Sequence, residues 1–129
     1  MKLNPRSILA KSLWLIGVYC LCLGSASAET VLGRWCDKVL PSLPQYNSVI
    51  TIVITDEGKV MLQDRFADGY SALDQELREA AGGIYETVGT DDKYRIVPST
   101  GNLQLIDNDG LIRTAIRLEN TPRSGECST

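Results

Sequence analysis

The sequence contains no histidine, and this absence removes several kinds of site chemistry at once. Histidine is the usual general base and proton shuttle of enzymes, because its ordinary pKa lies close to physiological pH. It is also the commonest protein ligand of zinc and copper. Phosphate-binding loops, nucleophile elbows and four-ligand metal motifs are missing as well. We therefore expect a protein that is not an enzyme and that holds neither a metal ion nor a cofactor.

Long apolar runs are scarce too. The longest, residues 13–24, is shorter than the ~20 residues that a membrane-spanning helix needs. Basic residues lie before it within residues 2–11, and the small-residue cleavage signal Ala26-Ser27-Ala28 follows it. This pattern predicts a secretory signal peptide over residues 1–28 and one mature domain, 29–129, exported to a bacterial periplasm without a stable membrane anchor. The alternative is an uncleaved N-terminal anchor.

Cysteine is rare in the expected mature domain, which keeps only Cys36 and Cys127. An exported chain folds in an oxidising compartment, so we expect a disulfide between them rather than free thiols. The bond would close nearly the whole domain, which the loop-entropy model values at about 4–5 kcal/mol. It would also leave no thiolate nucleophile.

Positive charge is in deficit. The whole chain has 13 basic and 16 acidic residues, and loss of the three basic residues of the signal peptide leaves 10 against 16, a formal charge of −6. An acidic surface argues against nucleic acid and anionic lipid as partners. It favours a basic protein partner. The sequence does not define the oligomeric state.

What the sequence does have is alternation of apolar and polar residues with the period of β-strands. Residues 48–55, 59–66 and 111–118 alternate, and shorter alternating stretches surround Tyr94 and Leu103. Turn residues separate these stretches. About eight short strands joined in this way predict an all-β fold, an antiparallel up-and-down meander that forms a small closed or nearly closed barrel.

Residues 71–81 are open to two interpretations. Leu73, Leu77 and Ala80 have helical spacing, and Gly82 is placed to end a short helix. As a strand, Leu73 and Leu77 would share one face and charged residues the other. The short turns on both sides and the surrounding meander favour the strand.

Gly33-Arg34-Trp35 opens the first expected strand. It resembles the G-x-W signature of lipocalins and their calycin relatives, in which the Trp closes one end of an up-and-down barrel and an Arg of the last strand packs over its ring. The resemblance implies that Arg113 or Arg117 takes this role by a cation–π contact. These arginines share one face of the last expected strand, whereas Ile112 and Ile116 lie on the other. The alternative is a Trp that plugs the end of an unrelated barrel.

The stretch Asp107-Asn108-Asp109-Gly110 has the appearance of half a calcium-binding loop. An EF-hand loop needs oxygen ligands at its first and twelfth positions, which here would be Leu105 and Ile116. We therefore interpret the stretch as a hairpin turn between two strands.

Aspartates recur in the turns of the expected meander, where every second turn lies at the same end of the barrel. By this parity one rim would hold Asp37, Asp68, Asp91, Asp92, Asp107 and Asp109. Such a rim would attract a basic protein or weakly hold a divalent ion. The alternative is that Asp is simply a common turn residue. A helix over 71–81 would change which turns lie at the same end of the barrel, and the aspartates would then be divided between the two ends.

Two further features lie near the same expected end. Leu40, Leu43 and Tyr46 form either a partner-binding loop or, the favoured reading, a lid that fills the barrel mouth. Asp64 falls on the inward register of its strand, so it is either a buried acid with a raised pKa or an exposed residue at the barrel end.

Taken together, these patterns predict a secreted, non-catalytic binding module, an accessory or inhibitor-like protein that recognises another envelope or secreted protein. The alternative is a carrier of a small molecule or lipid. A hydrolase that uses carboxylates comes third.

Overall fold

The structure, a computed structural model, describes residues 28–40, 42–119 and Cys127. Apart from Ala28, the expected signal peptide lies outside the described residues. The longest helix within them is a three-residue turn, so no described helix could cross a membrane.

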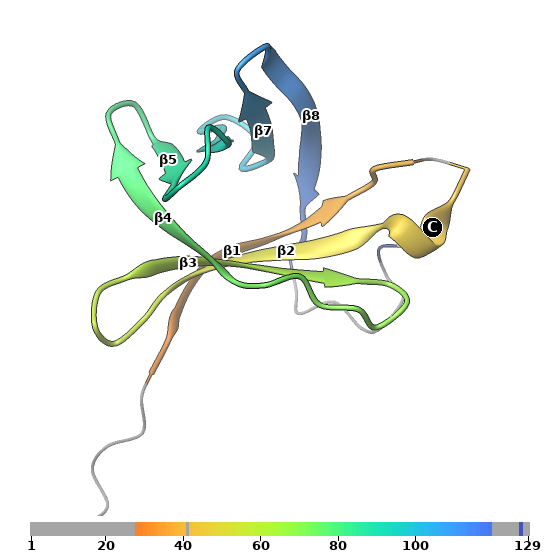
Figure 1. Ribbon diagram of the computed structural model, residues 1–129, viewed down its shortest axis with the longest axis horizontal. Helices are drawn as coiled ribbons and strands as arrows, with labels where there is room; N and C mark the ends of the chain where they lie inside the picture. The colour runs from red at the N-terminus through yellow and green to blue at the C-terminus, as the bar shows by residue number, and fades with distance from the viewer. Residues whose placement is uncertain (1–27, 41, 120–126, 128–129) are drawn as a thin grey trace, which may run out of the picture.

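Eight strands follow one another along the chain, and each pairs antiparallel with its neighbours (Figure 1). They are β1 (Thr30–Asp37), β2 (Ser48–Ile54), β3 (Val60–Phe66), β4 (Gln75–Ala80), β5 (Ile84–Thr87), β6 (Lys93–Ile96), β7 (Leu103–Asp107) and β8 (Gly110–Arg117), with a 3-10 turn, η2 (Pro44–Tyr46), before β2. Because β8 pairs back with β1, the sheet closes into a barrel. The predicted all-β meander and its closure are confirmed.

The ambiguous segment 71–81 is a strand where it is regular. β4 pairs with β3 on one side and β5 on the other, so the helical alternative is wrong. Leu77 points into the core, but Leu73 is 91% exposed, so the two leucines do not share a face. The reason is that residues 71–74 belong to the connection, which is held by a hydrogen bond from the backbone N–H of Ala72 to the carbonyl of Asp64.

The barrel interior follows the period of two along most of each strand, with register shifts between Val31 and Gly33 of β1 and at Leu105 and Ile106 of β7. The buried residues that contact one another come from seven of the eight strands: Trp35, Ile50, Ile52, Leu62, Leu77, Tyr94, Leu103, Leu105 and Ala115. Tyr85 of β5, the remaining strand, packs against this group while staying partly exposed. The middle of the barrel is therefore filled by the chain's own side chains.

β8 turns its arginine face inward. Ala115 is fully buried, whereas Ile112 and Ile116 on the opposite face are 49% and 57% exposed. Both arginines of this face contact β1: Arg113 pairs with the carboxylate of Asp37, and Arg117 lies over the ring of Trp35. Hydrophobicity alone would have predicted the reverse orientation of this strand.

The predicted disulfide between Cys36 and Cys127 is present. Both cysteines are buried, and the side-chain amide of Asn47 donates a 2.8 Å hydrogen bond to the carbonyl of Cys127. Cys127 is thereby fixed beside the start of β2.

Since successive strands run in opposite directions, their connections fall at two ends of the barrel. The end with connections 38–47, 67–74, 88–92 and 108–109 is called here the acidic end. The end with connections 55–59, 81–83 and 97–102 is called the tryptophan end.

Candidate functional site

The tryptophan end is closed by Trp35. Its indole N–H donates a 2.7 Å hydrogen bond to the carbonyl of Gly101, and the guanidinium carbon of Arg117 lies 5.9 Å from the ring centroid. A Cβ atom on Gly33 would lie 2.6 Å from the indole, so only glycine fits there. Of the two candidate arginines, Arg117 therefore makes the cation–π contact.

Arg113 has a different partner. Its Nε and Nη2 atoms donate hydrogen bonds of 2.6 and 2.7 Å to the two carboxylate oxygens of Asp37, whose side chain is only 2% exposed. The bond to Asp37 raises the pKa of Arg113. Two expectations are corrected: Arg113 does not cover Trp35, and Asp37 is no part of an exposed rim. The period of two explains this, because Asp37 lies two residues beyond Trp35 and so points inward.

Asp37 and Arg113 belong to a ring of inward polar side chains just inside the acidic end. With Ser48 of β2, Asp64 of β3 and Tyr94 of β6 they form what is called here the polar layer. Burial raises the pKa of Asp64, and the charge of Asp37 adds to this, while the Ser48 hydroxyl and Arg113 act in the opposite direction. Burial, together with the nearby acids, raises the pKa of Tyr94 to about 12.

Two oxygens of the polar layer have no well-aligned hydrogen bond among the described residues. They are Oγ of Ser48, a residue only 1% exposed, and Oδ1 of Asp64. The other members are engaged, since Arg113 binds Asp37 and the Tyr94 hydroxyl lies 3.4 Å from Oε1 of Gln75. The Ser48 hydroxyl is nevertheless a donor beside the Asp64 carboxyl group, and its interaction with that group lowers the pKa of Asp64.

The remaining aspartates of the predicted rim stay at the acidic end, in the turns around 67–70, 88–92 and 107–110. Three of them serve their turns: Asp68 accepts the backbone N–H of Tyr70 at 2.9 Å, Asp107 that of Asp109 at 2.8 Å, and Asp91 the side-chain amide of Asn108 at 3.0 Å. The last of these bonds joins two turns across the barrel rim. These five acids, of which Asp92 and Asp107 are half-buried and the others exposed, are called here the aspartate rim: Asp68, Asp91, Asp92, Asp107 and Asp109.

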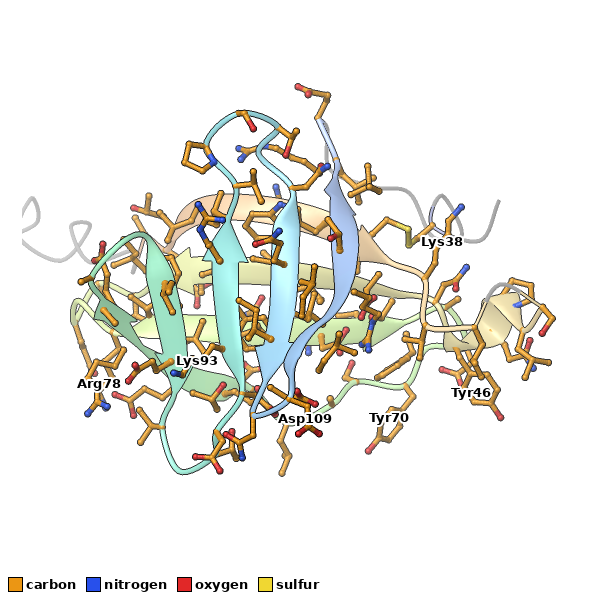
Figure 2. The ribbon with its side chains drawn as sticks, turned by 90° about the horizontal axis from the view of Figure 1, so that it is seen from above. Lys38, Tyr46, Tyr70, Arg78, Lys93 and Asp109 are labelled. Atoms are coloured by element: carbon orange, nitrogen blue, oxygen red, sulfur yellow. A yellow bond between two sulfur atoms is a disulfide. The ribbon has the colours of Figure 1, made fainter. Side chains whose placement is uncertain are left out.

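The loop before β2 does not fill the barrel mouth. Leu40, Leu43 and Tyr46 are 44%, 39% and 48% exposed, so the lid interpretation is wrong. Tyr70 in the neighbouring connection is 66% exposed. In Figure 2 the side chains of Asp109, Tyr70 and Tyr46 follow one another along the lower edge of the molecule. Exposed aromatic residues thus accompany the aspartate rim.

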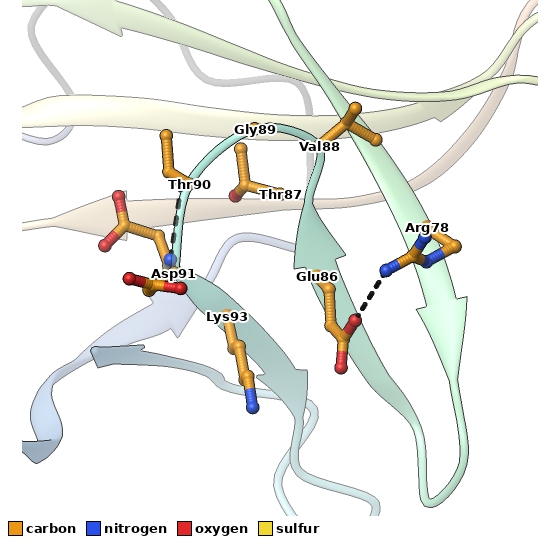
Figure 3. A pocket seen from close by; sticks show the side chains of 9 residues that line it. Arg78, Glu86, Thr87, Val88, Gly89, Thr90, Asp91 and Lys93 are labelled. Carbon is orange, nitrogen blue, oxygen red and sulfur yellow. Dashed lines mark hydrogen bonds and ion pairs between the residues drawn. The ribbon is translucent and has the colours of Figure 1, made fainter. Parts of the chain in front are cut away.

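Two hollows lie beside this rim. The larger, about 450 Å³, lies between β4, β5 and the 88–92 turn, and Figure 3 shows it lined mainly by polar side chains, with the 3.1 Å Arg78–Glu86 ion pair at its edge. The smaller, about 130 Å³, is lined by Tyr94 and Arg113 of the polar layer together with Lys93. The smaller hollow therefore borders Tyr94 and Arg113 but not Ser48, Asp64 or Asp37.

Neither the fold nor the comparisons supply a known chemistry. Within residues 28–40, 42–119 and 127, no three His, Cys, Asp or Glu side chains are grouped so that they could hold a metal ion. Comparisons with protein-family models, with curated proteins and with solved structures give no match.

The sequence reading missed the polar layer as a unit. Of its members, only Asp64 is predicted from the sequence as an inward polar residue, whereas Asp37 and Arg113 are predicted in other roles. Ser48 and Asp37 carry the same signal, since each continues the inward alternation of its strand toward the barrel end. The pairing of Asp37 with Arg113 cannot be predicted from any local pattern, because the two residues are 76 positions apart in the sequence.

Proposed function

We propose that the protein is a secreted, non-catalytic binding module of calycin-like shape that recognises a basic protein through its acidic end. The observation that carries this proposal is the gathering of five turn aspartates at one end of the barrel, beside exposed Tyr46 and Tyr70. The hydrogen bonds accepted by Asp68, Asp91 and Asp107 explain why an acceptor oxygen stands at these positions, but they do not require a negative charge there.

In such an interface the rim aspartates and the exposed tyrosines would have different effects. A one-sided acidic field steers a basic partner toward this end and orients it, which chiefly raises the association rate. Exposed tyrosines supply contact area with few rotatable bonds, and aromatic residues are enriched where binding energy concentrates. Leu73, at 91% exposure the most exposed large apolar side chain among those described, lies in the connection next to Tyr70.

The carrier alternative has weaker support. A small-molecule site of ordinary size needs an apolar cavity of about 300–1,000 Å³. The inward residues of this barrel are large and contact one another, and the larger hollow lies outside the barrel with a polar lining. The hydrolase alternative lacks a paired catalytic group, because Asp37 is already bound by Arg113.

Affinity capture from native envelope extract, followed by titration of the purified partner, tests the proposal. The test variant carries Asp68→Asn, Asp107→Asn and Asp109→Asn together. The control variant carries Asp56→Asn, Glu57→Gln and Glu79→Gln, the same change in net charge at the tryptophan end.

We expect a basic protein whose affinity falls about tenfold for the test variant and falls further as salt rises, since three rim charges at roughly 0.5 kcal/mol each amount to about one decade. The control should bind within about twofold of wild type. Equal losses in the two variants, or binding that salt does not weaken, would refute the proposal.

A further inference from the structure

We propose that a free backbone edge of β8, at the acidic end, binds an extended basic segment of the partner as an added β-strand. The inference rests on the proposed function, which supplies a basic partner, and it names the mode of recognition. In complexes of this kind, main-chain hydrogen bonds give the affinity and the side chains beside the edge select the segment. Residues 110–115 of β8 are called here the β8 edge.

The barrel closes through a short contact between β1 and β8. Two residue pairs join these strands, Trp35 with Arg117 and Cys36 with Ile116. On its other side β8 pairs with β7 from the start of the strand to residue 115. In Figure 1, β8 meets β1 only near its C-terminal end, and its N-terminal half has β7 alone beside it. Among the described residues, the β8 edge therefore has a neighbouring strand on one side only.

The alternation of backbone hydrogen bonds shows which groups of this edge are free. The N–H of Leu118 donates to the carbonyl of Arg34 of β1 at 2.9 Å, whereas the N–H of Arg117 donates to the side chain of Asn102, next to β7, at 3.0 Å. Successive residues of a strand bond to opposite neighbours, so Thr114 has the direction of Leu118 and faces away from β7. None of the described connections makes a backbone hydrogen bond to the β8 edge. The N–H and C=O of Thr114 are therefore free to pair with an added strand.

A β-bulge sets the side chains of the same edge. Leu105 of β7 pairs with Arg113, and the following residue, Ile106, pairs with Leu111, so Ile112 has no counterpart. Because a bulge interrupts the alternation, Leu111 and Ile112 both turn outward and are 57% and 49% exposed. Proteins commonly protect a free edge with charged side chains, but these two are apolar. Apolar side chains beside free backbone groups are the surface that an added strand covers.

Charge decides which kind of segment fits. The β8 edge follows directly on the turn that holds Asp107 and Asp109 of the aspartate rim. A Lys or Arg at one end of an added segment would lie near these carboxylates, while its apolar residues would lie against Leu111 and Ile112. A second copy of this chain, which has 16 acidic and 13 basic residues, would bring further acidic turns instead. The occupant is therefore a basic segment of another protein.

Hydrogen exchange followed by NMR tests whether the edge is free in the protein alone. The N–H groups of Arg113 and Ala115 face β7, and that of Thr114 does not. We expect Thr114 to exchange at least tenfold faster than both, after correction for intrinsic rates. Equal protection of the three amides would overturn the inference. Protection of Thr114 that grows with protein concentration would assign the edge to a second copy and would overturn it as well.

A peptide titration tests binding. The probe is acetyl-Lys-Val-Thr-Val-Lys-amide at constant ionic strength, with backbone amide shifts observed. One control peptide is N-methylated at the three central residues, which removes backbone donors and keeps the charge, and a second carries Glu in place of both Lys residues. The protein variants are Thr114→Pro, which removes only a free N–H, and Ile112→Ser. Val88→Ser, at a 56% exposed side chain of the same end, is the matched control.

We expect saturable shifts centred on the β8 edge, with a dissociation constant on the order of 1 mM for so short a segment. N-methylation and Thr114→Pro should each weaken binding at least tenfold, and the acidic peptide should give no saturable shift. Ile112→Ser should weaken it about threefold and Val88→Ser less than twofold. The N-methylated peptide meets the wild-type protein, so this comparison does not depend on how the proline variant folds. Equal binding of the methylated and unmodified peptides, or shifts that lie away from the β8 edge, would contradict the inference.

The captured partner separates this inference from the proposed function. If the partner binds with the rim dependence given above but leaves the exchange of Thr114 unchanged, the proposed function stands and the inference falls. If no basic protein is captured while the peptide slows the exchange of Thr114, the proposed function falls and the β8 edge remains a site for basic segments. Slower exchange of Thr114 in the complex, with displacement of the partner by the peptide, upholds both.

Discussion

At the tryptophan end, Trp35 is fully buried, lies against Gly33, donates to a turn carbonyl and is covered by Arg117. At the acidic end, Asp37 and Arg113 pair inside a layer in which Ser48 and Asp64 keep oxygens without a well-aligned hydrogen bond. Each end thus has one inward arginine from β8. The first completes an apolar plug, and the second neutralises one of two inward carboxylates.

This difference contrasts an end that stabilises the fold with the end to which the proposed function assigns the partner. A buried ring with every polar atom satisfied stabilises the barrel and offers nothing to a partner. Buried carboxylates and hydroxyls without well-aligned partners contribute little or negatively to stability, and proteins retain such features mainly at functional sites. The following changes test that division of labour, in order of their expected effect on stability.

Replacement of Trp35 should have the largest effect. Trp35→Ala removes a fully buried side chain, leaves a cavity at the centre of the tryptophan end and frees the carbonyl of Gly101. We expect a loss of about 3–5 kcal/mol in the free energy of unfolding. Urea denaturation with the disulfide intact measures it, and Tyr46→Ala, at a half-exposed ring of the acidic end, serves as control. A loss below about 1 kcal/mol would mean that Trp35 does not close the barrel.

The Asp37–Arg113 pair should come next. Asp37→Asn leaves the buried part of the Arg113 guanidinium without its counter-charge, and we expect a loss of about 2–3 kcal/mol, less than for a fully buried pair because Arg113 is 33% exposed. Asp37→Leu combined with Arg113→Met should restore most of it. If the double variant is as unstable as the single one, the pair itself stabilises the barrel, and the contrast between the ends weakens.

Much of this contrast could be foreseen from the sequence, but only where it depends on local pattern. Alternation located β2, β3 and β8, and Gly33-Arg34-Trp35 indicated a closed end. The prediction that the strand already includes Leu73 is wrong, because β4 begins at Gln75 and the preceding connection is held by the hydrogen bond from Ala72 to Asp64.

Pairing across the barrel could not be foreseen in the same way. Arg113 and Arg117 occupy equivalent faces of one strand, and only the closure of β8 onto β1 places one beside Asp37 and the other beside Trp35. The favoured prediction of a lid at Leu40, Leu43 and Tyr46 is wrong, because the same apolar sequence fits a loop that covers a barrel mouth and a loop that faces solvent.

Asp64 gives a smaller effect that depends on pH. Because the fold raises its pKa, the stability that Asp64 contributes is fully present below its ordinary value of 3.8 and is lost as pH rises through the raised value. Asp64→Asn should therefore match wild type in urea at pH 3 and exceed it at pH 7. A variant that is less stable than wild type at pH 7 would show that the ionised carboxylate supports the fold.

The aspartate rim should give the smallest effect on stability, although it carries the proposed binding. Asp68 and Asp107 each accept a backbone N–H two residues ahead, a bond that the side-chain oxygen of Asn can equally make. Asp68→Asn, Asp107→Asn and Asp109→Asn should each change the free energy of unfolding by less than about 0.5 kcal/mol. Asp68→Ala and Asp107→Ala, which remove the acceptor, should cost about 0.5–1.5 kcal/mol each.

Urea denaturation at low and high salt separates the two contributions of these residues. If the Asn variants are as stable as wild type at both salt concentrations, the turns need an acceptor but not a negative charge. The charge then has no role in the fold, and its concentration at the end that also holds Asp64 and the exposed tyrosines is explained by a cationic partner. If an Asn variant loses more than about 1 kcal/mol, the carboxylates stabilise their own turns by charge, and the acidic end needs no partner to explain it.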